Sequence, residues 1–329
     1  MSDVSAVARI GWHATLWFSA ASALAILKSR LAVSFDSRTR DTAASDTIVR
    51  HFECAWEEGL LLRQTLRQDL HRKLEGFFEV ERLMGELENV GGSAAEARVI
   101  SRMLVDCYSG ALLTDFIAVA MAIVGKTLYL RSLLKDHSAS SADDLSAANR
   151  IFICLAPRFV QHGTVLLAES IRNAVRAVFG KVSLQEPTSR VLLDSLISQV
   201  RHEIETSCGK SILDDCIFDK LDELISADLA PTRRRLFIAM VTESRRRLKS
   251  EHLKALLSEQ VSDSLSVMLG RVFSTPSETP QPLLLIIPRV SRLLRSANEM
   301  TVENKSLRMV AAALFVDCDS DVQNCMVYF

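Results

Sequence analysis

The sequence predicts an all-α fold, an elongated bundle of about six to seven long helices that follows an N-terminal membrane-anchor helix. Composition is the first observation: 48% of the 329 residues are hydrophobic, and Gly (12), Pro (7) and Tyr (3) are few. Such a composition favours helices over strands. The second observation is that apolar residues recur in steps of three or four. The third is that no segment alternates as a half-buried strand would, and no repeat of fixed period is present.

Charge and cysteine content narrow the class of protein. The formal net charge of -1 gives the chain no overall attraction to polyanions, so we do not expect nucleic acid as a partner. The seven cysteines are an odd number without a Cys-x-x-Cys pair, which indicates reduced thiols rather than a disulfide framework or a zinc site. We expect no cofactor and no metal.

The first element is an apolar run at residues 10–27, after a short tail at residues 1–9. It contains no charged side chain, and as a helix it would reach about 27 Å, close to the roughly 30 Å hydrocarbon core of a bilayer. Basic residues such as Lys28 and Arg30 follow it, so the positive-inside rule would place the rest of the chain in the cytosol. The residues expected to contact lipid are Trp12, Leu16, Trp17, Phe18, Leu24, Ile26 and Leu27.

Two other interpretations of this run stay open at this point. Ala21-Ser22-Ala23 and Ala23-Leu24-Ala25 both fit the pattern of small residues at a signal-peptide cleavage site. Alternatively, the run is a hydrophobic first helix packed on a soluble domain. Residues 28–46 are rich in Ser, Thr, Arg and Asp, and we interpret them as a polar tether.

A cytosolic helical domain is predicted for residues 47–317, before a C-terminal tail at residues 318–329. Its first helix starts near Thr47 and should end at the glycine-containing turn of residues 89–93. The apolar face of that helix comprises Leu66, Leu70, Leu74, Phe77, Val80, Met84 and Leu87.

A second helix is expected over residues 94–135, and its part at 110–125 is apolar nearly all round. Such a helix is central in a bundle or crosses a membrane. Asp115 near the middle favours the buried bundle helix, because an ionised carboxylate is costly in lipid.

The remaining elements follow from turn signals and apolar periodicity. Residues 137–148 are predicted to be a surface loop because they are rich in Ser and Asp. Helical runs are expected at roughly 150–180, 188–207, 211–227, 231–273 and 282–316. A proline-punctuated connection at residues 275–282 should interrupt regular structure.

One motif is compatible with enzymatic chemistry. Asp214, Asp215 and Asp219 form an Asp-Asp-x-x-x-Asp pattern, and the last two would share one helix face, where carboxylates can hold Mg²⁺ against a diphosphate. Such chemistry needs a second acidic cluster on a facing helix, and Asp143-Asp144 falls in the predicted loop. No glycine-rich phosphate loop or nucleophile elbow is present, so we do not expect an enzyme. An all-α, magnesium-dependent enzyme of isoprenoid type is kept as an alternative.

Basic residues cluster twice within the run at 231–273, about three helical turns apart. A basic stripe there could meet phosphates, lipid headgroups or an acidic partner, whereas the alternative is an ordinary solvated helix surface with interleaved glutamates. The residues of this candidate basic surface are Arg233, Arg234, Arg235, Arg245, Arg246, Arg247 and Lys249.

Several short motifs, taken in order, resemble a known family. They are "HFE" at 51–53, "TLRQDL" at 65–70, "VRAVFGKVSL" at 175–184, "ESRRRLKS" at 243–250 and "PLLLIIPRVSRLL" at 282–294. Together with the N-terminal apolar run, they resemble peroxisomal biogenesis factor three (peroxin-three) over about residues 10–316. The family's tryptophan beside its partner groove has no counterpart at residues 88–101, so the chain would be a divergent member.

The resemblance implies a peroxisomal membrane protein whose bulk faces the cytosol. It would dock the cargo receptor peroxin-nineteen through an amphipathic helix of that partner, and it would contact peroxisomal membrane lipid through its own N-terminal helix. The groove implied at the end of the first long helix and the start of the second would be lined by Leu83, Leu87, Val90 and Val99. The alternatives are a generic helical scaffold or a secreted helical protein.

Overall fold

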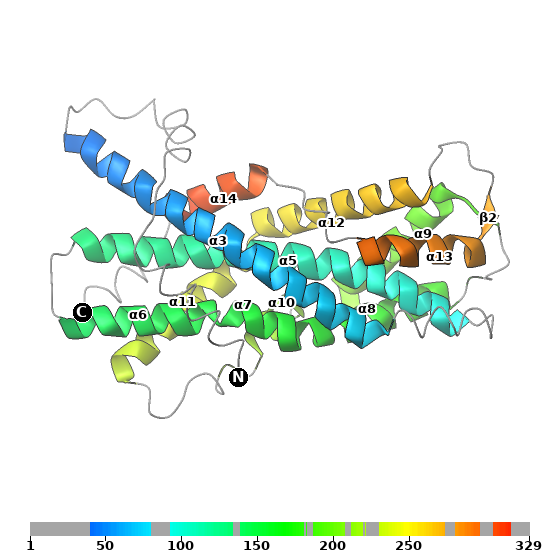
Figure 1. The fold of residues 1–329 in the computed structure, drawn as a ribbon, viewed down its shortest axis with the longest axis horizontal. Coiled ribbons are helices and arrows are strands. Elements are labelled where there is room, and N and C mark those ends of the chain that lie inside the picture. The colour runs from blue at the N-terminus through cyan, green and yellow to red at the C-terminus, as the bar shows by residue number, and fades with distance from the viewer. Residues whose placement is uncertain are drawn as a thin grey trace.

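The computed structural model confirms the all-α class. The structure describes residues 40–79, 93–133, 139–180, 182, 187–207, 212–219, 221, 230–273, 280–296 and 305–316. These residues are almost entirely helical (Figure 1). The predicted membrane anchor, most of the predicted tether and the predicted C-terminal tail lie outside the described residues.

Two long helices organise the fold. α3 spans Arg40–Phe78 and α5 spans Ser93–Leu133. In Figure 1, α5 lies along the long axis of the molecule and α3 crosses in front of it. α5 also packs against α8, α11, α12, α13 and α14, so it is the central helix of the bundle.

The bounds of α3 differ from the predicted ones at both ends. The helix begins at Arg40, so residues 40–46 of the predicted tether are helical. It ends at Phe78, where Glu79 adopts a φ of 44°, rather than at the glycines further along. A positive φ cannot continue a right-handed helix, so the backbone turns there. Leu66, Leu70 and Leu74 are buried as the periodicity predicted.

The predicted loop at 137–148 is wrong, because α6 spans Ala139–Ile153. Leu145, Ala148 and Phe152 lie in steps of three or four and are buried. Packing of this face therefore overrides the preference of Ser and Asp for loops. After a turn at Cys154 the chain continues through α7 (Leu155–Arg158), the π-helix η1 (Phe159–Gly163) and α8 (Thr164–Phe179).

The run predicted at 231–273 consists of two helices. α11 spans Pro231–Leu248 and α12 spans Glu251–Val272. Ser250 separates them with an extended backbone (φ -64°, ψ 143°), and its side chain accepts a hydrogen bond from the Leu253 N–H. A serine N-cap followed by an acidic residue is a helix-start signal, which the continuous apolar period concealed.

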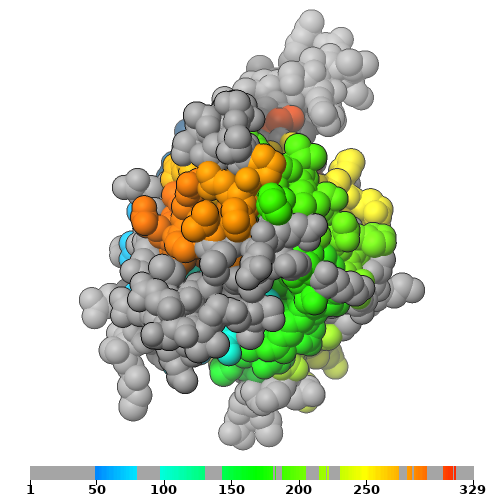
Figure 2. Space-filling model, turned by 90° about the vertical axis from the view of Figure 1, so that its right-hand side faces the viewer, coloured from blue at the N-terminus to red at the C-terminus, as the bar shows by residue number. Residues whose placement is uncertain are grey.

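The other elements are shorter. α9 spans Arg190–Ser207, and α10 covers Ile212–Phe218 of the predicted run at 211–227. α13 (Leu283–Ser296) and α14 (Lys305–Val316) cover the predicted run at 282–316. The last residues of the proline-punctuated connection form β2 (Gln281–Pro282), which pairs antiparallel with β1 (Pro187–Thr188), so regular structure begins within it. Figure 2 views this end of the molecule, where the orange surface of α13 adjoins green surface from the middle of the chain.

Two described segments are long and apolar enough to cross a membrane, namely Ala97–Tyr129 and Asp143–Phe179. The most apolar window of the first is 89% buried inside the protein, and that of the second is 56% buried. The first is therefore covered by other helices, as Asp115 predicted. The Asp115 side chain is 2% exposed and accepts a hydrogen bond from Gln260 Nε2 on α12 (2.8 Å).

Candidate functional site

An apolar hollow lies where α3, α5 and α14 meet. It is a shallow depression whose free volume is about 10 Å³. Its apolar walls are formed by Trp56, Leu60, Ile117, Ala118, Met121 and Leu307, and Arg63 and Thr114 are the polar side chains that line it. This volume is about enough for one water molecule, so an anchor residue of a partner would cover this apolar depression rather than fill it.

The close approach of α3 to α5 forms the floor of the hollow. Gly59 on α3 has no side chain, and a Cβ atom there would lie 3.1 Å from Met121 Cγ and 3.4 Å from Ile117 Cγ2. The missing side chain therefore lets the two helices touch at this point. Residues on either side of it, Trp56 and Leu60, form the wall above.

α14 forms one side of the hollow and is held there by two contacts with α3. Arg308 Nη2 donates to Glu53 Oε1 at 2.7 Å. Phe52 packs edge to face against Phe315, with ring centroids 5.6 Å apart, and stacks on Trp56 at 6.1 Å. The aromatic contacts fix the indole of Trp56 at one end of the hollow, so this wall is preformed.

Apart from Arg63 and Thr114, the side chains that line the hollow are apolar. The Thr114 hydroxyl donates to the Gly110 carbonyl oxygen at 2.7 Å within α5. No nucleophile and base meet among the residues that line it. In the described part of the chain, no three His, Cys, Asp or Glu side chains form a group that could hold a metal ion.

Two carboxyl groups and one thiol on α3 and α5 have raised pKa values. Burial raises the pKa of Asp115 to about 7, against a hydrogen bond from Gln260 that lowers it. Burial also raises the pKa of Glu58 to about 7, and its Oε2 is buried without a hydrogen-bond partner. The pKa of Cys54 rises to about 11, first through burial and then through nearby glutamates, so this thiol is unreactive at neutral pH.

Val99 is the one predicted groove residue that the structure describes, and it does not line the hollow. Leu83, Leu87 and Val90 lie outside the described residues. Val99 is 2% exposed and packs in the core, which contradicts its assignment to an open groove wall. Because α5 is buried on most sides, apolar periodicity alone could not separate wall positions from core positions.

Sequence reasoning missed Trp56 and Leu60. A signal for them exists, because Phe52, Trp56 and Leu60 are spaced four residues apart and share one helix face. The glycine beside Leu60 marks the close helix contact. Neither feature shows that α14 packs at this place, because Leu307 of α14 follows Leu60 by more than 240 residues in the sequence.

The acidic motif does not form a paired metal site among the described residues. Asp215 is exposed, and Asp219 is half-buried in the turn after α10. The structure does not describe the side chain of Asp214. The facing acidic cluster that magnesium chemistry needs would include Asp144, which instead accepts a hydrogen bond from Arg233 Nε on α11.

The candidate basic surface is divided by ion pairs. Arg233 pairs with Asp144, and Arg247 Nε donates to Glu243 Oε1 at 2.6 Å with its side chain largely buried. The guanidinium of Arg245 lies over the Phe218 ring, 5.0 Å from its centroid. Arg234, Arg235 and Arg246 on α11 remain exposed, as does Lys249 at its C-cap. The seven residues are thus not one continuous stripe.

Comparison with known proteins adds no relative: no protein-family model matches the chain, and no curated protein matches it.

Proposed function

We propose that this chain is a docking protein of the peroxisomal membrane that receives the cargo receptor peroxin-nineteen. The observation that carries the proposal is the preformed apolar hollow between α3, α5 and α14. An amphipathic helix docks by placing apolar anchors, spaced three or four residues apart, into such a depression. The ordered sequence motifs that resemble peroxin-three support the identity of the partner.

The residues that line the hollow include types that contribute strongly to protein–protein binding. A tryptophan wall and an arginine at the rim are the residue types that dominate interface energies. Leu60 is partly exposed and lines the hollow, whereas its neighbour Leu61 is 61% exposed and does not line it. This pair of adjacent leucines provides a matched test.

We expect Leu60→Asp to weaken binding of an N-terminal peroxin-nineteen peptide to the full chain by roughly 10- to 100-fold, measured by calorimetry in neutral detergent. The estimate corresponds to the loss of one buried leucine contact. Leu61→Asp should bind as the wild type does. Equal binding by both variants and the wild type would exclude the hollow as the docking site.

A third variant, Leu87→Ser, tests the groove that the family resemblance implies at the end of the first long helix. Loss of binding by Leu87→Ser together with unchanged binding by Leu60→Asp would keep the docking function but move the site. If the wild-type chain fails to bind the peptide, the proposed function itself is wrong.

A further inference from the structure

The outward face of α11 carries a narrow stripe that the docking proposal does not use. It consists of Arg235, Ile238, Thr242, Arg246 and Lys249, which we call the α11 outer stripe. All five are exposed. At 3.6 residues per turn these positions fall within an arc of roughly 80°, so they form a straight row about 21 Å long.

The opposite face of α11 fixes the helix to the bundle. Leu236, Phe237, Met240, Val241 and Leu248 are buried there. α11 packs against α6 and α5, and it crosses behind α6 in Figure 1. The α11 outer stripe therefore stands on a rigid support.

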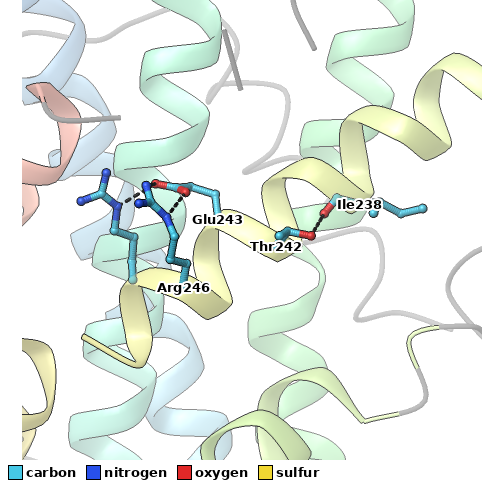
Figure 3. Close-up of polar contacts among 5 residues, drawn as sticks. Ile238, Thr242, Glu243 and Arg246 are labelled. Carbon is cyan, nitrogen blue, oxygen red and sulfur yellow. Dashed lines mark hydrogen bonds and ion pairs between the residues drawn. The ribbon is translucent and has the colours of Figure 1, made fainter. Parts of the chain in front are cut away.

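The charge of the stripe has one sign. Glu243 is the only acidic residue between 231 and 249, and it is 4% exposed. Its carboxylate accepts hydrogen bonds from Arg246 Nε (2.8 Å) and Nη2 (2.9 Å), as Figure 3 shows. Hydrogen bonds from Arg246 and Arg247 lower the pKa of Glu243 against the effect of burial, so this group stays ionised and orients the Arg246 guanidinium. Arg246 nevertheless remains 48% exposed.

The centre of the stripe suits close contact with another helix. Ile238 is 45% exposed and supplies one apolar anchor. Thr242 is small, and its hydroxyl already donates to the Ile238 carbonyl oxygen at 2.8 Å (Figure 3). Covering Thr242 would therefore leave no donor unsatisfied, which removes the usual cost of burying a hydroxyl group.

We propose that the α11 outer stripe binds an acidic helical segment of a second partner protein. The row is one helix wide, and its steps of three and four residues match the seam between two packed helices. Because Arg235 lies at one end of the stripe and Arg246 and Lys249 lie at the other, we expect the partner helix to carry carboxylates at both of its ends. It should carry apolar or small residues where it faces the centre of the stripe. A membrane surface would be served better by aromatic residues and by basic groups from several elements.

The test uses the full chain in neutral detergent and a labelled synthetic helix of about 18 residues, long enough to be helical with side-chain staples. One face of this probe carries Leu and Ala, and Glu residues flank that face. A matched probe has Gln in place of every Glu. We expect the acidic probe to bind at least tenfold more tightly than the matched probe in fluorescence anisotropy at 50 mM salt, and to weaken as salt is raised.

Two variants and two controls locate the binding. Arg235→Glu and Ile238→Ser should each weaken the acidic probe by roughly fivefold. Arg292→Glu on α13 and Val267→Ser on α12 change an exposed arginine and an exposed β-branched apolar residue elsewhere, and they should leave binding unchanged. Circular dichroism melting curves should overlay for all four proteins, because every changed side chain is exposed.

Three results would overturn the proposal. Equal losses in Arg235→Glu and Arg292→Glu would indicate general charge attraction. An unchanged affinity in Ile238→Ser would indicate a polyanion patch without helix packing. Binding of phosphatidylserine vesicles through Arg235 without binding of the acidic probe would assign the stripe to a membrane surface. Since the hollow is on other helices, a failed peroxin-nineteen interaction would leave these measurements unaffected.

Discussion

Asp115 is a carboxyl group buried at the contact between α5 and α12. Its carboxyl group accepts a hydrogen bond of 2.8 Å from Gln260 Nε2 on α12. Burial raises its pKa from 3.8 to about 7 because a carboxylate loses its hydration there. The protonated form is therefore favoured in the folded state.

This shift predicts that stability falls as pH rises. A carboxyl group with a folded pKa above its unfolded pKa stabilises the protein fully below about pH 4, and that contribution is lost by about pH 7. We expect Asp115→Asn, which keeps the shape and a hydrogen bond to Gln260, to melt higher than the wild type at pH 8. At pH 4 the two proteins should melt alike.

The measurement is the difference in melting temperature between the two proteins from pH 4 to pH 8. Glu58 and His51 also have shifted pKa values, but they are present in both proteins and cancel in the difference. A difference that does not change with pH would show that Asp115 is not the titrating group.

At the scale of elements, the backbone of η1 at Gly163 packs directly against the backbone of α10 at Cys216. A Cβ atom on Gly163 would collide with the Cys216 carbonyl oxygen and would lie 2.7 Å from the Phe159 ring. The π-helical turn places this glycine against α10, so the fold requires the absence of a side chain there.

We expect Gly163→Ala to lower the free energy of unfolding by about 1 to 3 kcal/mol, because backbone must shift to relieve the contact. Gly270→Ala on α12 is the matched control, since a Cβ there meets nothing within 4 Å. It should be neutral or stabilising by up to about 1 kcal/mol through helix propensity. Urea unfolding measures both, and a neutral Gly163→Ala would show that η1 adjusts freely.

The elements also show how far the sequence predicts the fold. The bounds of α5 were predicted to within two residues because a long apolar helix is marked by composition, period and flanking turns alike. α6 was missed because its Ser- and Asp-rich start favours a loop locally, whereas Leu145 and Ala148 gain burial only once α11 packs against them. The hollow was missed for the same reason: Leu307 reaches it only through the tertiary fold.

For the whole molecule, the central position of α5 bears on membrane attachment. The most apolar window of the first described apolar segment is 89% buried by protein, and the second segment contains the turn and the π-helix that precede α8. Any helix that contacts lipid should expose its apolar side chains instead. We therefore propose that attachment depends on residues 10–27, which lie outside the described residues.

That proposal predicts a selective loss of membrane association. Leu24→Arg places a charge within the apolar run and should cost about 2.5 to 3.5 kcal/mol if that position lies near the bilayer centre. The full-length variant should then appear in the supernatant after carbonate extraction, whereas the wild type stays in the membrane pellet. Ser34→Arg, which lies beyond the run, should remain in the pellet. If Leu24→Arg also stays in the pellet, attachment resides in another segment, and α5 or the α6 to α8 region would have to leave its packing in the bundle to reach lipid.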